Sequence, residues 1–440
     1  MSNPLVAIVG RPNVGKSTLF NRIMRSRDAI VSDVPGTTRD RLLAQVVWDD
    51  IRFTLVDTGG LEPKPQDQIR QKVRAQVEAA VLEADVIIFL MDAVDGLTPM
   101  DEEISDWLRR TQKPLVTAIN KADNERRELS AAEFHKLGRD EPLLISAYHN
   151  LGIYGLMKRV ISLLPTPDAQ DEEAPEGVMR LAIVGRTNVG KSMLLNSILG
   201  QERAIVSEIA GTTRDALDTH FTYGGRPVVL IDTAGMRRPG KVEKGIEYYS
   251  VLRSMKAVER CDIALLVMDA SELATAQDAH ICGHAWDDYK GLIVVVNKWD
   301  LVPKEDGTEQ ELALQKVRRL LHFTSYVPIC FTSAMNGEGI ENLMALAMDV
   351  YQERQTHIPP GRLHYALKDA LAEHMPPYRK GKRPKITDVR QVSTNPPTFV
   401  FAVNDPKSMH FSYQRYLENR LRSTFGFTHT HLRLVFRGRI

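Results

Sequence analysis

Short apolar runs alternate along the chain with longer segments of mixed polarity. The first set of runs comprises Leu5–Val9, Phe53–Val56, Val86–Met91 and Leu115–Ile119. Their content of Val, Ile and Leu on both faces is typical of strands buried in a parallel sheet. The segments between them have the length and polarity of helices. We therefore predict an α/β domain with a mainly parallel sheet, whose ligands bind beyond the carboxyl ends of the strands.

The whole pattern then occurs a second time. Its second set of runs comprises Leu181–Val184, Val228–Ile231, Ile263–Met268 and Leu292–Val296. The segment LVAIVGRPNVGKS at 5–17 recurs as RLAIVGRTNVGKS at 180–192, an offset of 175 residues, and GTTRD at 36–40 recurs at 211–215. A period this long indicates a duplicated domain rather than a solenoid repeat.

Two breaks separate the repeats from each other and from the end of the chain. Residues 165–178 contain three prolines, five acids and no base, which is typical of an extended, solvated linker. A second break, THIPPG, lies at 356–361. We predict a first repeat domain at 1–165, an acidic linker at 166–178, a second repeat domain at 179–355 and a small module at 356–440.

The C-terminal module lacks the repeated motifs and has an α/β pattern of its own. Its predicted elements are a helix at 363–374, strands at 386–392 and 398–403, a helix at 408–424 and a strand at 431–437. This order differs from that of the repeats, so the module is not a third copy.

Charge is distributed unevenly along the chain. Lys and Arg total 57 and Asp and Glu 56, but residues 357–440 contain 15 bases and 5 acids, which leaves 42 bases and 51 acids for the other 356 residues. The densest basic cluster is 379–385. Clustered bases favour RNA phosphates, although an acidic domain of the same chain is an equally charged partner. The module has no GxxG loop of the usual KH type.

Several classes of protein are excluded by composition. The three cysteines, Cys261, Cys282 and Cys330, are too few and too widely spaced for a disulfide framework or a CxxC metal site. The apolar stretch at 5–9 follows neither a basic leader nor a cleavage site, and no apolar run approaches the roughly 20 residues of a membrane-spanning helix. We expect a cytoplasmic protein with reduced cysteines and no membrane partner.

Each repeat carries a phosphate-binding loop, GxxxxGK[ST], between a strand and a predicted helix. The glycines let backbone N–H groups approach phosphates, the lysine neutralises their charge, and the serine hydroxyl ligates Mg²⁺. The predicted loop residues are Gly10, Arg11, Pro12, Asn13, Val14, Gly15, Lys16 and Ser17, and in the second copy Gly185, Arg186, Thr187, Asn188, Val189, Gly190, Lys191 and Ser192. Two such loops in register make a chance match improbable.

A DxxG motif follows the second predicted strand of each repeat. Its aspartate suits the Mg²⁺ shell and its last glycine can offer an N–H to the γ-phosphate. The motifs are Asp57, Thr58, Gly59 and Gly60, followed by Leu61, and Asp232, Thr233, Ala234 and Gly235, followed by Met236. Within GTTRD, Thr38 and Thr213 offer a second hydroxyl to Mg²⁺. The alternative is a Thr-rich loop in which Asp40 or Asp215 caps a helix.

The base is identified by NKAD at 120–123 and NKWD at 297–300. A carboxylate at Asp123 or Asp300 accepts from guanine N1–H and from the exocyclic amine, whereas adenine has neither donor there, so the nucleotide is GTP and not ATP. The predicted guanine-site residues are Asn120, Lys121, Asp123, Ser146 and Ala147, and in the second copy Asn297, Lys298, Trp299, Asp300, Ser333 and Ala334.

Neither repeat has a glutamine after DxxG, where Ras-like GTPases orient the attacking water. Leu61 and Met236 stand there instead and cannot polarise water. A side-chain oxygen at Asn13 or Asn188 can help to coordinate a monovalent cation beside the phosphates. The alternative is a loop asparagine that satisfies its own turn. The residues predicted to act on the γ-phosphate are Lys16, Thr38, Gly60, Lys191, Thr213 and Gly235.

The paired motifs and the short last module closely resemble the EngA (Der) family of double-domain bacterial GTPases. The resemblance covers essentially the whole chain. It implies two Ras-like P-loop domains and a KH-like domain, and a monomer that acts in assembly of the large ribosomal subunit through its rRNA. It also implies potassium-stimulated hydrolysis with Asn13 and Asn188 as cation ligands. Met193 departs from the small hydroxyl residue of many relatives, and we expect little effect.

Two other functions stay open. One is a nucleotide-gated RNA-modification or translation factor whose chemistry resides in a partner. The other, a membrane-recruited G protein, is disfavoured because the chain has no lipid-anchor motif. In the favoured scheme, Tyr249 and Arg253 lie shortly after the second DxxG motif, where they can transmit the nucleotide state to the basic module.

Overall fold

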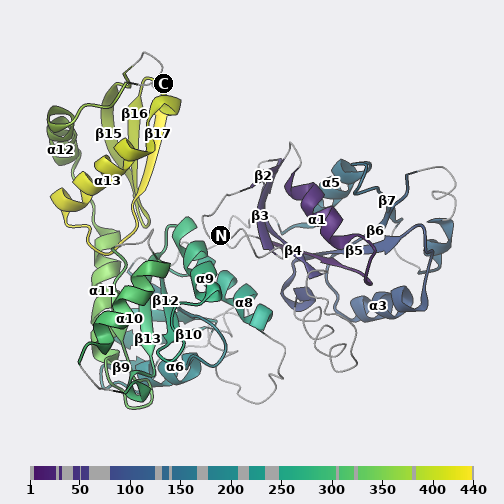
Figure 1. The fold of residues 1–440 in the computed structure, drawn as a ribbon, viewed down its shortest axis with the longest axis horizontal. Helices are drawn as coiled ribbons and strands as arrows, with labels where there is room; N and C mark the ends of the chain where they lie inside the picture. Colours follow the sequence, from purple (N-terminus) through teal and green to yellow (C-terminus); the bar gives the residue numbers. More distant parts are fainter. Residues whose placement is uncertain are drawn as a thin grey trace. The chain divides into compact units, whose positions relative to one another are not determined.

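The computed structural model describes most of the chain, namely residues 4–25, 29–31, 43–49, 51–58, 80–123, 131–137, 141–165, 177–206, 218–232, 247–303, 307–321, 326–378 and 383–438. It comprises two compact units (Figure 1). One consists of Met1–Ala174 with Gly240–Lys256, and the other of Pro175–Pro239 with Ala257–Ile440. The second unit therefore contains the C-terminal module and the second repeat except for residues 240–256, which belong to the first unit.

The first repeat forms a seven-stranded sheet in the order β2-β3-β4-β1-β5-β6-β7. Its strands are β1 (Leu5–Val9), β2 (Ala29–Val31), β3 (Leu43–Trp48), β4 (Ile51–Asp57), β5 (Val86–Asp92), β6 (Leu115–Asn120) and β7 (Leu143–Leu144). The pairs from β4 to β7 are parallel, and β3 pairs antiparallel with both β2 and β4. The described helices are α1 (Lys16–Met24), α3 (Pro99–Arg110), the 3₁₀ helix η2 (Ala131–Leu137) and α5 (Ile153–Leu163).

Alternate residues of the central strand enter two different cores. Val6 and Ile8 of β1 pack with α1 and α5 on one face of the sheet. Leu5, Ala7 and Val9 pack on the other face, in the core that α3 also enters. Because side chains point to opposite faces in turn and both faces are covered, the whole strand is apolar. This confirms the predicted α/β fold class.

The second repeat has the same topology, with strands in the order β14-β13-β12-β8-β11-β10-β9. They are β8 (Met179–Val184), β9 (Ala204–Val206), β10 (Thr219–Tyr223), β11 (Arg226–Ile231), β12 (Ile263–Asp269), β13 (Gly291–Asn297) and β14 (Ile329–Phe331). The helices are α6 (Lys191–Leu199), α8 (Glu247–Arg260), α9 (Ala276–Asp287), η3 (Trp299–Leu301), α10 (Glu309–Leu320) and α11 (Ile340–Gln355). Here too the alternating residues of the central strand divide between two cores.

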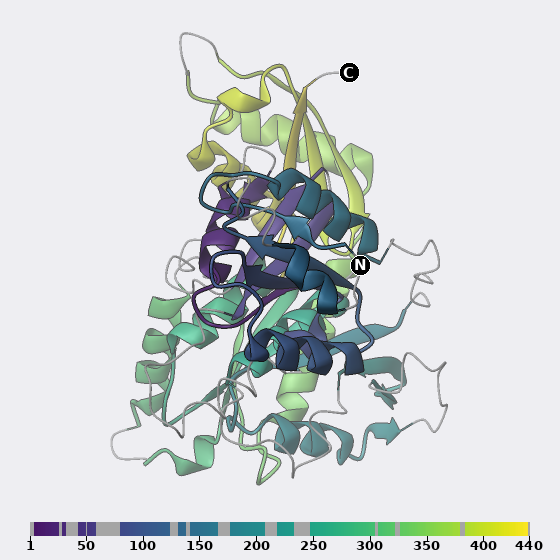
Figure 2. The ribbon, with the colours of Figure 1, turned by 90° about the vertical axis from the view of Figure 1, so that its right-hand side faces the viewer.

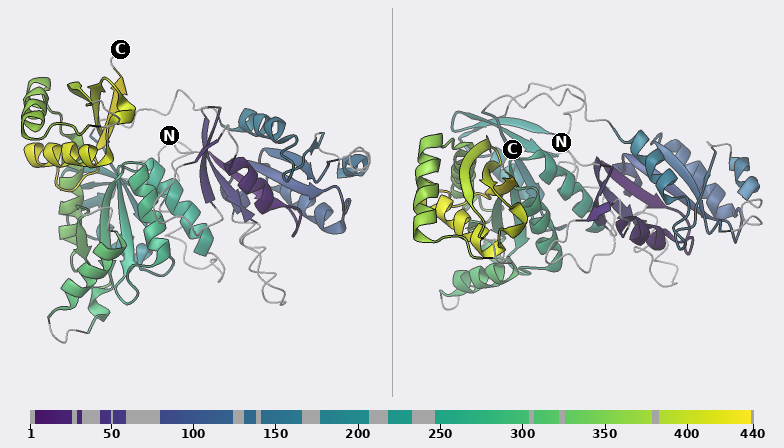
Figure 3. Two further views of the ribbon diagram at one scale, coloured as in Figure 1. Left: turned by 45° about the horizontal axis from the view of Figure 1, so that its top comes forward. Right: turned by 90° about the horizontal axis from the view of Figure 1, so that it is seen from above.

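The C-terminal module is a three-stranded sheet in the order β15-β16-β17 with two helices beside it, as Figures 2 and 3 show from other sides. Its elements are α12 (Pro360–Glu373), β15 (Ile386–Thr394), β16 (Pro397–Val403), η4 (Pro406–Ser408), α13 (Phe411–Phe425) and β17 (Arg433–Gly438). Phe399 and Phe401 of β16 are buried against Leu363 of α12 and Leu417 of α13. β15 pairs antiparallel with β16, and β16 pairs parallel with β17.

The second helix and the last strand of the module both begin later than predicted. The second helix begins at Phe411 rather than at 408, because the His410 side chain caps it by accepting from the Ser412 N–H at 3.2 Å. The last strand begins at Arg433 rather than at 431, because His431 contacts the second repeat instead of extending β17. Both shifts arise from contacts of single side chains.

The module is attached to the second repeat through a buried arginine. Arg354 of α11 has 1% of its surface exposed. Its guanidinium donates to Asn395 Oδ1 at 2.8 Å, to the Tyr289 carbonyl at 3.0 Å and to Thr430 Oγ1 at 3.3 Å. Asn395 in turn donates to Asp262 Oδ1 at 2.8 Å. Burial lowers the pKa of Arg354 to about 10, so it stays charged at neutral pH.

None of the helices in the described ranges has both the length and the apolar character needed to cross a lipid bilayer.

Candidate nucleotide-binding sites

The lysine of each phosphate-binding loop is held by carbonyls of its own loop. Lys16 Nζ donates to the Gly10 and Arg11 carbonyls at 2.8 and 2.7 Å. Lys191 makes the equivalent bonds to Gly185, at 2.8 Å, and to Arg186. Burial lowers the pKa of Lys191 to about 8. Each lysine is the first residue of the helix that follows the loop, at a helix N-terminus, which favours phosphate.

Two loop glycines are required by geometry. Gly15 and Gly190 have φ of 95° and 96°, in the left-handed region that glycine adopts without strain. A Cβ at Gly15 would also lie 2.4 Å from Asn120 Nδ2, and one at Gly190 would lie 2.3 Å from Asn297 Nδ2. The second glycine of each loop thus makes room for the first residue of NKxD.

That asparagine joins three motifs in each site. Asn120 Nδ2 donates to the Val14 carbonyl at 2.8 Å, and its Oδ1 accepts from the Ala147 N–H at 2.9 Å. In the second copy Asn297 donates to the Val189 carbonyl at 2.9 Å and accepts from the Ala334 N–H at 3.0 Å. Residues more than 100 positions apart are therefore held together by one buried carboxamide in each site.

The lysine of NKxD is paired with an aspartate that lies outside the GTP-binding motifs. Lys121 Nζ lies 2.5 Å from Asp92 Oδ2, and Lys298 Nζ lies 2.6 Å from Asp269 Oδ2. Burial acts to raise the pKa of Asp269, but hydrogen bonds from Lys298 and Ser271 outweigh it and lower that pKa. The signal was present in the sequence, because MDA recurs at 91–93 and 268–270 at the end of equivalent strands.

The arginine of each phosphate loop contacts the start of a neighbouring helix. Arg186 Nε lies 3.4 Å from Asp278 Oδ1, and Asp278 also forms the capping box of α9 with Thr275. In the first copy Arg11 Nε lies 3.3 Å from the matching Asp101 of α3. Both aspartates are fully buried, and burial raises the pKa of Asp278. These acids therefore connect the phosphate loop to a helix outside the motifs.

The described residues offer a suitable set of ligands for Mg²⁺. Asp57 ends β4 and is buried, and Asp232 follows β11 directly. Ser17 and Ser192 lie in the first turns of α1 and α6. Carboxylate and hydroxyl oxygens are hard ligands of the kind Mg²⁺ prefers, so these residues fit the ion.

The base-reading carboxylates have different neighbours in the two sites. Asp123 Oδ2 lies 3.5 Å from His149 Nε2. In the second site Asp300 belongs to η3 and is exposed, while Trp299 packs edge-on against Phe331 with ring centroids 4.5 Å apart. The two sites therefore share their motifs but differ in the side chains around the aspartate that is predicted to bind the base.

Part of the predicted site lies outside the described residues. These positions are Thr38, Gly59, Gly60, Leu61, Thr213, Thr233, Ala234, Gly235 and Met236, together with Asp40 and Asp215 of the capping alternative. Their roles stay predictions.

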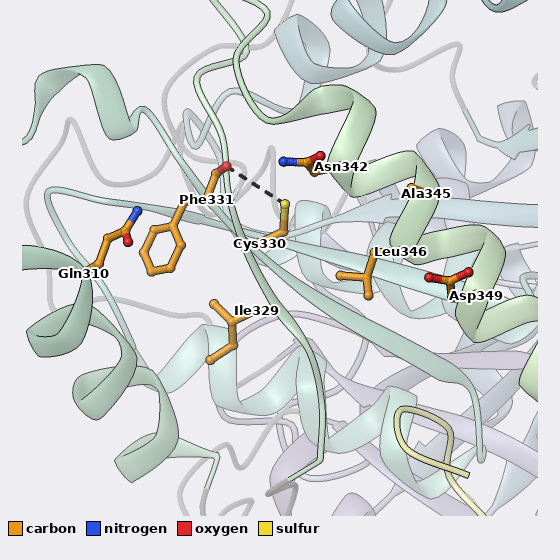
Figure 4. A pocket seen from close by; sticks show the side chains of 8 residues that line it. All are labelled: Gln310, Ile329, Cys330, Phe331, Asn342, Ala345, Leu346 and Asp349. Atoms are coloured by element: carbon orange, nitrogen blue, oxygen red, sulfur yellow. Dashed lines mark hydrogen bonds between the residues drawn. The ribbon is translucent and has the colours of Figure 1, made fainter. Parts of the chain in front are cut away.

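A cavity of about 490 Å³ lies elsewhere in the second repeat (Figure 4). It is lined by the edge strand β14 and by side chains of α10 and α11, among them Gln310, Cys330 and Asp349. It contains no residue of the predicted GTP motifs.

Comparison with known proteins gives full-length matches. Residues 5–121 and 180–298 match a family described as "50S ribosome-binding GTPase", and 357–437 match "KH-domain-like of EngA bacterial GTPase enzymes, C-terminal". GTPase Der of Thermomicrobium roseum is 49% identical, over 100% of this chain and 97% of its own. GTPase Der of Caldanaerobacter subterraneus subsp. tengcongensis is 50% identical over 97% of both chains. A crystal structure of Aquifex aeolicus Era bound to GDP.AlF4⁻ is 25% identical, with a TM-score of 0.31, over 59% of this chain and 88% of that one.

Fold, motifs and matches together define a tandem P-loop GTPase with a KH-like module at its C-terminal end. It binds and hydrolyses GTP. Within that class, the chain belongs to the EngA (Der) family, as the resemblance of its motifs had indicated.

Proposed function

We propose that the protein is a GTP-controlled switch in the assembly of the large (50S) ribosomal subunit, and that its nucleotide state determines binding to that subunit and its rRNA. We expect it to act in the cytoplasm as a monomer. The observation that carries this proposal is that one helix contacts both the second phosphate loop and the KH-like module.

Helix α9 provides the connection. Arg186 of the phosphate loop pairs with Asp278 in its first turn. At the other end, Trp286 stacks on His431 of the module with ring centroids 3.7 Å apart, and Tyr289 stacks on the same ring at 4.6 Å. A nucleotide that shifts Arg186 therefore acts on a helix that also contacts the module. Such a packed chain of contacts is a physical route for coupling.

The module offers a surface suited to RNA beside its basic cluster. Arg383 lies over the Tyr378 ring at 4.4 Å, and Tyr378 is 69% exposed. Exposed aromatic rings with arginine stack on unpaired bases, and bases bind phosphates. Among described residues, the contacts with the second repeat use other positions, including Asn395 and His431. This favours RNA over intramolecular docking on that repeat.

Hydrolysis at both sites is proposed to need Mg²⁺ and to be faster in K⁺ than in Na⁺. Bound Mg²⁺ would neutralise phosphate charge, held by Ser17, Thr38 and Asp57 or by Ser192, Thr213 and Asp232. Asn13 and Asn188 are proposed K⁺ ligands, and both have a positive φ, of 67° and 65°, at the same place in the two loops. Equal turnover in KCl and NaCl would contradict the potassium role.

The central test measures binding of the full chain to purified large subunits with GDP and with a non-hydrolysable GTP analogue. Wild type, Lys16→Ala and Lys191→Ala are compared. We expect binding to depend on the nucleotide and this dependence to weaken in Lys191→Ala, because α9 contacts the second loop. If all three proteins bind the subunits equally with GDP and with the GTP analogue, the proposed switch is wrong.

Depletion in cells separates the favoured function from the alternative. Accumulated free subunits in sucrose gradients support a role in assembly. Normal gradients with undermodified tRNA would instead support the RNA-modification factor.

A further inference from the structure

The base-reading aspartate of the first site has a titratable partner. His149 Nε2 lies 3.5 Å from Asp123 Oδ2, and the two side chains are 52% and 22% exposed. Asp123 is the residue assigned to guanine N1–H and to the exocyclic amine. The histidine thus stands beside the one carboxylate that identifies the base.

The second site has the same loop backbone without this side chain. The His149 N–H donates to Ser146 Oγ at 3.3 Å, and the Asn336 N–H donates to Ser333 Oγ at 3.3 Å. The loops differ in the side chain of the donating residue, which is the imidazole of His149 in the first site and the carboxamide of Asn336 in the second. Asparagine carries no ionisable group, so only the first site has an ionisable side chain at this position.

The imidazole packs on its neighbour in the loop, and α1 holds the backbone of that loop. The Tyr148 ring contacts it edge-on with centroids 4.9 Å apart, where the second copy has Met335. Arg22 of α1 donates from Nε to the Ala147 carbonyl at 2.8 Å and from Nη2 to the Tyr148 carbonyl, and the matching residue of α6 is Ser197. The position of His149 is therefore built into the first site alone.

The charges around His149 define its effect. The Asp123 carboxylate lies 3.5 Å from His149 Nε2, the Arg22 guanidinium of α1 binds the backbone carbonyls of Ala147 and Tyr148, and the Tyr148 ring packs on the imidazole. Lys121 points instead to Asp92 and to the Asn13 carbonyl. Protonated His149 therefore finds its counter-ion in Asp123.

We propose that His149 is a positioning residue for Asp123 that makes guanine-nucleotide affinity at the first site depend on pH, while the second site lacks this dependence. Protonation places a positive charge beside Oδ2 and occupies part of its acceptor capacity, so the carboxylate attracts the two guanine donors less strongly. Affinity at the first site therefore falls when His149 takes up a proton at lower pH. This inference rests on the proposed guanine reading by Asp123.

The test titrates full-length protein with a fluorescent GDP between pH 8 and pH 5.5. A Lys191→Ala background weakens the second site, and His149→Asn copies the residue of that site. Because the terminal phosphate of GDP also titrates in this range, the measured quantity is the ratio of the two dissociation constants at each pH. We expect that ratio, histidine over asparagine, to rise roughly threefold or more between pH 8 and pH 5.5, because a charged imidazole beside Asp123 competes with the guanine donors and an asparagine does not.

The reciprocal variant tests whether a histidine gives the second site the same pH dependence of GDP affinity. Asn336→His in a Lys16→Ala background should weaken GDP binding at acid pH relative to its parent. His149→Gln, which keeps a polar side chain that does not titrate, should behave as His149→Asn does, and thermal melts confirm folding. A pH-independent ratio within twofold in a folded His149→Asn protein would overturn the inference.

The proposed guanine reading can fail separately. Asp123→Asn should lose GDP and gain xanthosine diphosphate. If it keeps its preference for GDP, then the assignment of Asp123 is wrong. If it switches and the pH ratio stays flat, only the role of His149 is wrong.

Discussion

The imidazole of His431 lies stacked on the indole of Trp286, with the ring planes inclined by 25° and the centroids 3.7 Å apart. His431 Nδ1 is 3.0 Å from the Trp286 carbonyl, which can only accept, so Nδ1 carries the proton of the neutral ring. This pair joins the KH-like module to the second GTPase domain through the end of α9. Its chemistry leads directly to a prediction about pH.

The second GTPase domain and the module should lose stability together as the pH falls below about 6.5. Burial, with a smaller effect of Arg422, lowers the pKa of His431 to about 3. The unfolded chain, with a histidine pKa near 6.5, therefore binds more protons between these values, and the free energy of unfolding falls by up to about 1.4 kcal/mol per pH unit. Urea unfolding of the full chain at pH 4–7, followed by circular dichroism, measures this slope.

His431→Gln is the control for that prediction. Glutamine does not titrate, so its variant should show a shallower slope over the same range, from a lower stability at pH 7. Equal slopes for the two proteins would show that His431 does not carry the effect.

Arg354→Met should destabilise the same pair of domains. The guanidinium binds Asn395, Tyr289 and Thr430 in a site with 1% exposure, and its loss leaves these groups without their charged donor. We expect a loss of about 3 kcal/mol in the free energy of unfolding. Arg437→Met, at an exposed position of β17, is the matched control and should change stability by less than about 0.5 kcal/mol.

Two glycine substitutions should have opposite effects. Gly190→Ala requires φ of 96° at alanine and a Cβ 2.3 Å from Asn297 Nδ2, so we expect lost nucleotide binding at the second site and a destabilisation of at least about 1 kcal/mol. Gly155→Ala lies on the exposed face of α5 with nothing within 4 Å of the new Cβ. It should stabilise the first domain by about 0.5–1 kcal/mol. Nucleotide titration and urea unfolding distinguish the outcomes.

Asp300→Asn should change the base that the second site accepts. Its carboxamide presents a donor to the carbonyl that xanthine carries in place of the guanine amine. In a Lys16→Ala background, GDP affinity should fall by at least roughly a hundredfold, because a polar group of the base loses its partner. Affinity for xanthosine diphosphate should rise. Unchanged discrimination between the two nucleotides would remove Asp300 from its assigned role.

Most of the central strands were predictable from the sequence because both of their faces are buried. A strand such as Ile263–Met268 is apolar throughout because helices cover both faces of its sheet. The hairpin strands were missed for the opposite reason. Thr219–Tyr223 buries only alternate residues, so its sequence THFTY has no continuous apolar run. Short edge strands such as β14 also contain too few residues for a clear period.

The nucleotide motifs were predictable because each is continuous in sequence and is repeated. Their partners were harder to find. Asp92 pairs with Lys121 and Asp278 with Arg186, at separations of 29 and 92 residues, and only the fold brings these charges together. His149 gave no motif at all, since its meaning depends on its distance to Asp123.

The sequence by itself determined the duplication, the two phosphate loops, the guanine motifs and the basic character of the last module. These properties depend on residue types at short spacing, where backbone geometry follows from a few neighbouring residues. The tertiary structure decided how the module is attached, through Arg354 and the Trp286–His431 stack, and which of two matching sites has a titratable neighbour. Such contacts join distant segments, and which side chains meet is settled by packing of the completed fold.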